Sequence, residues 1–461
     1  MAEANYTSKL SAWASSADAF PADVDEQGKR ILLDQFANQI ACAPLPWSKA
    51  FRDSVLGLGS GSGATSVYYG DSLAIDQAAF LNSAFGHGNE FDDTHLRSTT
   101  HPGAVVGPPV LALAQNHHLS GRAVLDAIVV GSEIMIRIAT AASPHLHNRG
   151  HHTPPAVGPF GAAIGCSRVL GLTASQTENA MAIAGSHAGG LLEYDRTGGS
   201  VKRIHCAIPA MSGLRSTLMA QQGITGPTSV LEGERGFLKV FAGEYNADLL
   251  TKDLGSDWLL YGMAYKPFAS NFSTHAPFQA LGELRAEHGL TAENIEKIVI
   301  GTSHHTVEHV GTIVEPPDIL GAQFSLRFGS AVRMIYGGNG FYDYREEDLH
   351  DPRFLNIARR VELVVDPIAD KERKTINNRS AVVTVTTKDG RSFERRVQYS
   401  KGLPENPLSN TELTQKFFDA VIPCIGERRA NELAERVWAI EEMSDAGALL
   451  PLTHAVTPAA V

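Results

Sequence analysis

Apolar residues recur at a helical spacing through the first half of the chain. Within residues 22–42 they include Ile31, Leu32, Phe36 and Ile40, and this spacing predicts a helix with one apolar face. The same pattern predicts helices over residues 104–118, 119–143, 155–171, 173–184 and 207–222. Several of these segments are rich in Gly and Ala, which allows helices to pack closely. The first half therefore predicts a large helical bundle.

Three of the predicted helices begin with recognisable start signals. Ser120 stands at an N-cap position, and Thr173 is followed three residues later by Gln176, as in a capping box. His101 is followed by Pro102. Proline disfavours helix in the residue before it and suits the first helical turn, so we expect a helix to begin directly after His101.

The pattern changes to β-branched runs in the second half of the chain. These runs cover residues 295–301, 360–365, 381–387 and 392–397. The dipeptide Asp389-Gly390 between the last two predicts a β-hairpin. Helical patterns also occur at residues 275–287, 323–336, 410–418 and 428–440.

These elements predict a mainly α fold with two parts. We expect a large all-helical domain built from residues 1–262 and 398–461, and a smaller α+β lid domain built from residues 263–397. The order helical, α+β, helical means that the C-terminal segment returns to the helical body.

Composition narrows the class of protein. Apolar residues make up 43% of the 461 residues and charged residues 19%, which is ordinary for a globular chain. The net charge of -11 argues against nucleic acid as a partner. The four cysteines form no CxxC pair, the N-terminus lacks a signal-like apolar core, and Pro108 and Pro109 interrupt the longest apolar stretch. We therefore expect a cytoplasmic protein without disulfides or membrane spans.

The densest group of ionisable residues lies in the segment 86–103. It contains three carboxylates, three imidazoles and the guanidinium of Arg97. Its acidic members are Glu90, Asp92 and Asp93, and its histidines are His87, His95 and His101. So many protonatable groups in one loop favour an acid–base site, and the helix start after it would attract an anion. A solvated charge network is the alternative.

Two further segments carry candidate cations. The first runs from Tyr194 through a Gly-Gly pair to Lys202, Arg203 and His205. The second begins at Lys266, close to the expected domain junction, where clefts usually form. A desolvated lysine can serve as a base. A surface loop and a domain linker are the respective alternatives.

Two other motifs predict no ligand site. His305, Glu308 and His309 follow the H-x-x-E-H order of inverted zincins, but they follow a predicted strand and have no evident third ligand, so we expect no metal. The glycine-rich segment 57–63 lacks the Gly-Lys-Ser/Thr ending of a phosphate loop. Because His305, Glu308 and His309 have no evident third ligand, a zinc hydrolase is only a minor alternative.

Several segments together resemble the MmgE/PrpD family. They are AAFLNSAFGHGNEFDDTH, THPGAVVGPPVLALA, KRIHCAIPAMSGLRSTLMAQQGITGPTSVLEGERGF, KPFASNFSTHAPFQAL, GAQFSLRFGSAV and KGLPENPLSNTELTQKF. The family includes 2-methylcitrate dehydratase, cis-aconitate decarboxylase and iminodisuccinate epimerase. The resemblance implies a helical domain with an α+β lid, a site in the cleft between them, a homodimer, and catalysis without a metal or organic cofactor.

The resemblance also implies roles for individual residues. Proton-transfer roles fall on His101, Lys202, Lys266 and Asp93. Substrate contacts fall on Glu90, Thr94, Asn271 and Phe328. Beside them, we expect Arg97, Arg203 or His205 to hold the substrate carboxylates through charge-assisted hydrogen bonds. Glu90 replaces an aspartate of the family motif. Asn271 and Phe328 stand where the decarboxylases of the family have a histidine and a lid tyrosine.

These departures decide the predicted reaction. Without that histidine and tyrosine, a cis-aconitate-type decarboxylase is the less favoured prediction. We predict a cofactor-independent epimerase, resembling iminodisuccinate epimerase, that removes and returns a proton α to a carboxylate of a small di- or tricarboxylate. A 2-methylcitrate-type dehydratase is the close alternative. A non-catalytic carboxylate-binding protein is a third possibility.

Overall fold

A computed structural model describes residues 5–59, 61–194 and 199–456. The chain forms two compact units. The helical unit comprises residues 1–88, 92–263 and 410–461, and the mixed unit comprises residues 89–91 and 264–409. The protein is mainly helical, and the mixed unit contains a four-stranded sheet, as the sequence predicted.

The unit boundaries lie at 263/264 and 409/410, whereas the sequence analysis drew them at 262/263 and 397/398. The segment after residue 397 stays with the mixed unit through backbone contacts. The amide of Lys401 donates to Gln279 Oε1 at 2.7 Å, and the amide of Tyr265 donates to the carbonyl of Gly402 at 2.9 Å. The return to the helical unit therefore begins at Asn410.

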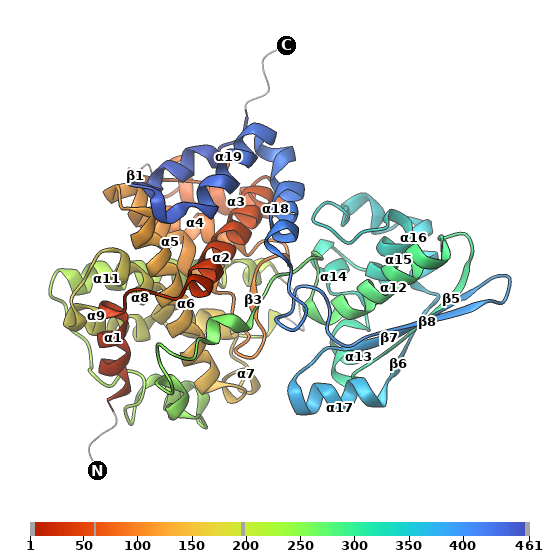
Figure 1. Ribbon diagram of the computed structural model, residues 1–461, viewed down its shortest axis with the longest axis horizontal. Coiled ribbons are helices and arrows are strands. Elements are labelled where there is room, and N and C mark those ends of the chain that lie inside the picture. The colour runs from red at the N-terminus through yellow and green to blue at the C-terminus, as the bar shows by residue number, and fades with distance from the viewer. Residues whose placement is uncertain (1–4, 60, 195–198, 457–461) are drawn as a thin grey trace. The chain divides into compact units, whose positions relative to one another are not determined.

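The helical unit contains most of the helices (Figure 1). Their bounds are α1 Tyr6–Ser16, α2 Ala22–Cys42, α3 Pro46–Leu56, α4 Ile75–Gly86, α5 Pro102–His117, α6 Gly121–Ala142, α7 His145–Asn148, α8 Thr153–Val169, α9 Ala174–Ala184, α11 Ala207–Gln221, α18 Asn410–Ile425 and α19 Glu427–Trp438. The short strands are β1 Gly63–Thr65, β2 Ser72–Ala74, β3 Thr94–His95 and β4 Met263–Ala264.

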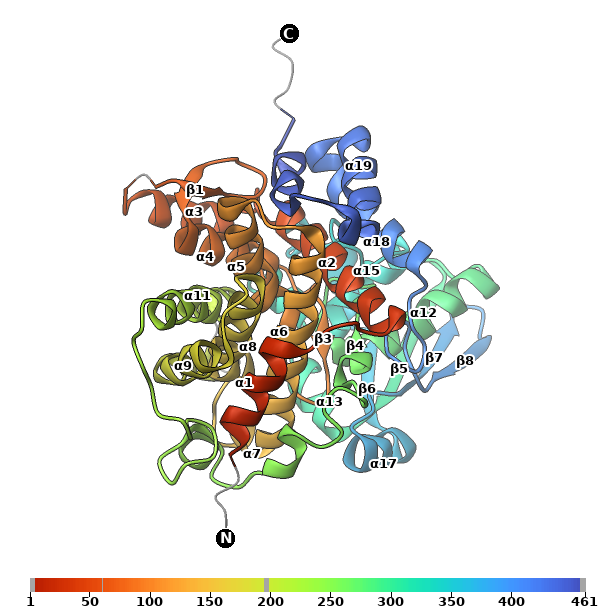
Figure 2. The same cartoon turned by 60° about the vertical axis from the view of Figure 1, so that its left-hand side comes forward.

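Helices α5, α6 and α8 form the centre of the helical unit and lie side by side in both views (Figures 1 and 2). Glycines let α6 and α8 approach closely. A Cβ added at Gly131 would lie 3.0 Å from the carbonyl oxygen of Gly161 and 3.0 Å from the Cα of Gly165. The small residues seen in the sequence therefore act as contact points between helices.

The predicted helix starts are confirmed. Ser120 Oγ accepts the amide of Ala123, and Thr173 forms a capping box with Gln176. Helix α5 begins at Pro102 with His101 as its N-cap residue. Pro108 and Pro109, which interrupt the apolar stretch in the sequence, lie inside α5.

The sheet of the mixed unit has the strand order β6-β5-β7-β8. Strands β5 (Ile295–Thr302) and β6 (Val361–Val365) run parallel, and β7 (Ala381–Thr387) pairs antiparallel with both β5 and β8 (Ser392–Val397). The β7–β8 hairpin turns at Gly390, whose φ of +86° suits glycine. The predicted hairpin is confirmed.

Helices of the mixed unit pack around this sheet. They are α12 His275–His288, α13 His304–Val310, α14 Ile319–Gln323, α15 Leu326–Tyr336, α16 Pro352–Ala358 and α17 Pro367–Ile376. Helix α12 contacts β7 and β8, and α15 contacts both α12 and α16. Along β7, alternate residues from Ala381 to Thr387 are buried, which is the period expected of a strand with one face on the core.

Two expected absences can be compared with the structure. Among the residues that the structure describes, no helix combines the length and apolar character needed to cross a bilayer. The four cysteines, all within the described ranges, are free thiols.

Candidate active site

Most of the ionisable loop between α4 and α5 is buried within the helical unit rather than solvated, and its residues 89–91 belong to the mixed unit. His87, Asp92, Asp93, Thr94 and His101 are all buried. The amide of Gly103, in the first turn of α5, donates to Asp93 Oδ2 at 3.0 Å. This bond satisfies one of the amides that a helix start leaves without an intrahelical partner, so the loop is fastened to the helix that follows it.

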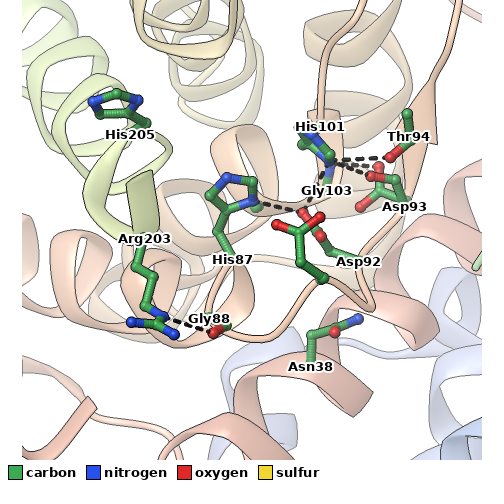
Figure 3. Close-up of polar contacts among 12 residues, drawn as sticks. Asn38, His87, Gly88, Asp92, Asp93, Thr94, His101, Gly103, Arg203 and His205 are labelled. Atoms are coloured by element: carbon green, nitrogen blue, oxygen red, sulfur yellow. Dashed lines mark hydrogen bonds and ion pairs between the residues drawn. The ribbon is translucent and has the colours of Figure 1, made fainter. Parts of the chain in front are cut away.

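One carboxylate oxygen organises two histidines in this loop (Figure 3). Asp92 Oδ2 lies 2.7 Å from His87 Nδ1 and 3.0 Å from His101 Nδ1. The two imidazole rings have centroids 4.7 Å apart. Asp92 accepts a hydrogen bond from His87 and places its carboxylate beside His101, so it orients the first ring as the aspartate of a catalytic triad orients its histidine.

The contacts of His101 define its tautomer. Its Nδ1 lies 2.7 Å from the backbone carbonyl of Asp93 and 3.2 Å from Thr94 Oγ1. Because a carbonyl oxygen only accepts, His101 Nδ1 carries the proton, and the ring exchanges protons through Nε2. His87 Nε2 is buried without a hydrogen-bond partner.

Burial keeps His87 neutral. Desolvation, together with the positive charge of Lys202, lowers the pKa of His87 to about 3. A neutral imidazole whose Nδ1–H is held by a carboxylate presents a lone pair at Nε2. His87 therefore has the protonation state of a base at neutral pH.

A second histidine pair lies beside the first. His152, the N-cap residue of α8, and His205 have their Nδ1 atoms 2.8 Å apart. The His152 ring lies 6.5 Å from that of His87. Burial lowers the pKa of His205 to about 4, and burial followed by the charge of neighbouring His205 lowers the pKa of His152 well below its usual value.

Lys202 and Arg203 lie on the short helix Ser200–Ile204, and both are buried. The charge of Lys202 contributes to the lowered pKa of His87, His152 and His205, so the lysine lies close to all three rings. Residues 195–198 of the preceding glycine-rich loop, in which a cation-presenting segment was predicted, lie outside the described residues.

The Arg203 side chain contacts other residues of the helical unit. Its Nε donates to the carbonyl of Gly88 at 3.2 Å, and its guanidinium lies 3.8 Å from the centre of the Trp47 ring. These contacts tie Ser200–Ile204 to the loop that carries His87. Arg203 thus positions the loop, a role that the sequence analysis had not assigned to it.

Asp93 lies in a group of buried carboxyls. Burial, and then the nearby charges of Asp34 and Asp92, raise the pKa of Asp93 well above its usual value. Its Oδ2 accepts the amide of Gly103, and its Oδ1 is buried without a hydrogen-bond partner. The Asp93 carboxyl is therefore held at the start of α5, whereas the Asp92 carboxylate directly contacts the histidines.

The mixed unit carries the remaining residues expected from the resemblance, apart from Arg97. Lys266 Nζ lies 3.4 Å from Glu90 Oε2, and both side chains are buried. Asn271 caps the short helix Phe272–Thr274 by accepting the amide of Ser273.

Phe328 and Arg97 lie in contrasting surroundings. The Phe328 ring is fully buried and stacks on Phe354 with centroids 5.7 Å apart, so it packs the interior of the mixed unit. Arg97 is exposed in the helical unit, and its charge contributes to the lowered pKa of His95.

A metal fits this arrangement poorly. Among the described residues, His87, Asp92 and His101 form the one group of three ligand-type side chains within 4.8 Å of one another. His87 Nδ1, however, is hydrogen-bonded to Asp92 Oδ2, and His101 Nδ1 is hydrogen-bonded to the Asp93 carbonyl. A ligating imidazole nitrogen must carry no proton. His305 and His309, on α13, do not belong to such a group.

Several residues of this site were not predicted from the sequence. His87 and Asp92 were seen in the loop but given no role, and the HHTPP segment containing His152 was not singled out. Its signal was a histidine before prolines at a helix start, as at His101. Asp34 on α2 and Lys416 on α18 gave no local signal, because they lie hundreds of residues apart and meet only in the fold.

Comparisons with known proteins match most of the chain. A family model described as the MmgE/PrpD N-terminal domain matches residues 8–250, and one described as the MmgE/PrpD C-terminal domain matches residues 268–440. The chain is 28% identical over 477 residues to a protein named cis-aconitate decarboxylase from Aspergillus terreus, covering 98% of this chain and 96% of the relative.

Two more distant relatives carry related names. A human protein named cis-aconitate decarboxylase is 28% identical over 393 residues, covering 83% of this chain and 80% of the relative. A protein named 2-methylcitrate dehydratase from Cupriavidus necator is 27% identical over 382 residues, covering 78% and 75% respectively.

Proposed function

The chain belongs to the MmgE/PrpD family, and we propose that it is a lyase acting on a small polycarboxylate. The observation that carries this proposal is the contact of Asp92 Oδ2 with both His87 Nδ1 and His101 Nδ1. Two oriented imidazoles in a buried setting suit proton transfer at carbon. The names of the relatives supply the substrate class.

The cations supply what a polycarboxylate needs. A proton α to a carboxylate is weakly acidic, so negative charge that develops on that group must be stabilised by a nearby cation. Lys202 lies among the histidines, and the first turn of α5 adds the positive end of a helix dipole close to His101. Anion capture depends on this local field, whereas the net charge of -11 belongs to the whole chain.

Dehydration is the first form of the proposal. It requires a base for the C–H proton and an acid for the departing hydroxyl. The Nδ1-protonated tautomer of His101 leaves its Nε2 bare and favours abstraction of the proton there. Lys202 is the matching proton donor. The hydroxyl leaves as water with a proton from Lys202, a C=C bond forms in the product, and the proton held by the ring then returns to Lys202 through solvent.

Decarboxylation is the second form, favoured by the coverage of the relatives. The Aspergillus terreus decarboxylase aligns with 98% of this chain, against 78% for the dehydratase. Loss of CO₂ leaves a carbanion that needs a proton, which an ammonium or an imidazolium can supply. The resemblance places Asn271 and Phe328 at two ionisable positions of the decarboxylases, which is why dehydration is proposed first.

The sequence predicted an epimerase, and epimerisation is now an alternative that the experiment below distinguishes from the lyase reaction. The relatives described above carry lyase names. Epimerisation was predicted because Asn271 and Phe328 replace ionisable groups of the decarboxylases. In the structure Asn271 caps a short helix and Phe328 packs in a core, and this replacement weighs against decarboxylation without distinguishing epimerisation from dehydration. Epimerisation would use the same proton abstraction with return to the opposite face.

A panel of small polycarboxylates in deuterated water, followed by NMR, tests the proposal. The panel includes 2-methylcitrate, citrate, cis-aconitate and iminodisuccinate. A new olefinic signal without CO₂ indicates dehydration, and CO₂ release indicates decarboxylation. Deuterium uptake without an unsaturated product indicates epimerisation and would overturn the lyase proposal.

Two variants separate catalysis from binding. If the protein only binds carboxylates, His101→Ala and Lys202→Ala should alter affinity, and the wild type should show no turnover. If the proposal holds, both variants lose turnover while circular dichroism shows an intact fold. We also propose that the protein is a homodimer, as the resemblance implies, and light scattering of the purified chain tests this.

A further inference from the structure

The His152–His205 pair borders a cavity in the helical unit. The cavity has a volume of about 450 Å³, and its lining includes Pro155, Leu191, Tyr194, Val201, His205 and Ile208. His205 is thus both a wall of this cavity and the hydrogen-bond partner of His152. His152, in turn, lies beside the His87 ring of the Asp92 group.

The backbone holds this pair in place from both sides. The amide of His152 donates to the carbonyl of Gly190 at 3.3 Å, and the amide of Leu192 donates to Gly150 at 2.9 Å. The amide of His205 donates to the carbonyl of Lys202 at 3.0 Å. Tyr194 packs against both rings, with centroid distances of 5.3 Å. Backbone hydrogen bonds and the Tyr194 ring therefore hold each imidazole in place, in addition to the contact between the two histidines.

The pair requires one shared proton. A hydrogen bond between two Nδ1 atoms needs one ring protonated at Nδ1 and the other bare there. Each neutral ring has one proton, so the ring that accepts at Nδ1 must carry its proton at Nε2. Burial and the charge of Lys202 favour the neutral form of both rings. The two histidines are consequently locked into opposite tautomers.

We propose that His152 and His205 form a two-ring proton relay between the Asp92–His87–His101 group and the 450 Å³ cavity. The inference rests on the proposed function, because it assigns to this pair the exchange of the reaction's proton with water. His205 is then a positioning and relay residue. It does not hold a substrate carboxylate, which was the role expected from the sequence.

The relay step balances without any co-reactant. In the resting state His152 carries its proton at Nδ1 and is bare at Nε2, and His205 is bare at Nδ1 and protonated at Nε2. His87 Nε2 has no direct hydrogen-bond partner and its ring lies 6.5 Å from that of His152, so its proton passes to His152 Nε2 through one bridging water. The Nδ1–H bond of His152 then breaks and a new N–H bond forms at His205 Nδ1. His205 then releases its Nε2 proton to water in the cavity. Reversal of these steps delivers a proton inward.

Other charged and titratable groups near the pair set its energetics. Lys202 disfavours a long-lived imidazolium, as do His87 and His101 when they are protonated. Such a setting suits a transient carrier, because a ring that stayed charged would block the next transfer.

Three variants test the relay. His205→Asn keeps a polar side chain toward His152 but cannot pass a proton, so kcat should fall about 10- to 100-fold with little change in KM. His205→Ala opens the wall of the cavity, and added imidazole should restore part of its kcat. His187→Asn is the matched control, because His187 lines the same cavity and is exposed, and it should behave as the wild type. A His205→Asn variant with wild-type kcat, or a His205→Ala variant that imidazole does not rescue, would overturn the relay.

Nitrogen-15 NMR of histidine-labelled protein adds a test without substrate. The wild type should show scalar coupling between the two Nδ1 atoms and opposite tautomers for His152 and His205. Identical tautomers, or two doubly protonated rings, would contradict the relay. If the wild type turns over none of the polycarboxylates but shows the coupled pair, the lyase proposal fails and the shared proton stands.

Discussion

Asp34 Oδ1 and Lys416 Nζ lie 2.5 Å apart, although 382 positions separate them in the sequence. Both side chains are buried, at 0% and 5% exposure. The Asp34 carboxylate also accepts the backbone amide of Asp93. This ion pair therefore joins the C-terminal helix α18 to α2 and to the loop that carries the candidate site.

Removing one partner of this pair should destabilise the protein strongly. Lys416→Met leaves the buried Asp34 carboxylate without its counter-charge, and we expect a loss of about 3–5 kcal/mol in the free energy of unfolding. Urea denaturation measures this loss. Lys29→Met, at the partly exposed pair with Glu441, is the control and should cost no more than about 1 kcal/mol. Equal losses in the two variants would contradict the assigned role of burial.

Asp92 and Asp93 should differ in their importance for turnover. Asp92→Asn removes the charge that orients His87 and His101, so we expect kcat to fall about 100-fold or more. The Asp93 carboxyl contacts neither histidine ring, its Oδ2 accepts the Gly103 amide, and burial raises its pKa, so Asp93→Asn, an amide of similar shape, should lower kcat by no more than about tenfold. Steady-state kinetics on the substrate found in the polycarboxylate panel provides the measurement. A larger loss in Asp93→Asn would restore the direct proton-transfer role predicted for Asp93.

Two glycines on α5 should respond in opposite ways to alanine. A Cβ at Gly103 would lie 2.3 Å from Asp93 Oδ1, whereas at Gly107 the nearest atom is Gln35 Cγ at 3.8 Å. Alanine is favoured over glycine within a helix by about 1 kcal/mol. Gly107→Ala should therefore keep or raise the melting temperature, and Gly103→Ala should lower it. A Gly103→Ala protein as stable as the wild type would show that the contact with Asp93 relaxes freely.

Acid should destabilise the fold below the usual pKa of histidine. Burial lowers the pKa of His87 to about 3 and that of His95 and His205 to about 4, so the unfolded chain binds more protons than the folded one. This stability is complete above pH 6.5 and is lost as the pH falls toward 4, at about 1.4 kcal/mol per pH unit for each histidine. The raised pKa of Asp93 acts in the opposite direction and offsets part of the slope.

Denaturation curves at about pH 7.5, 6.5 and 5.5, on both sides of the usual histidine pKa of about 6.5, measure this dependence. His87→Asn should flatten the slope, because it removes one of the groups whose pKa is lowered. His187→Asn, at an exposed position, should leave the slope as it is. A stability that is constant over this range would contradict the burial of neutral histidines.

The sequence by itself determined the elements and the segment that holds the site. Helix spacing and caps located α2, α5, α6 and α9, and alternation with an Asp-Gly turn located the β7–β8 hairpin. These signals are local, because a cap or a turn depends on residues within one helical turn or hairpin. The density of ionisable residues identified the loop 86–103 for the same reason.

Only the tertiary structure decided which of those ionisable residues act together. It brought His152 and His205 into contact across 53 positions and Asp34 to Lys416 across 382. It also placed Arg203 in a hydrogen bond with the carbonyl of Gly88 and buried Phe328 in a core. Burial and long-range contacts set the pKa values and proton positions on which the chemistry depends, and these arise when distant segments pack, so no local pattern in the chain records them.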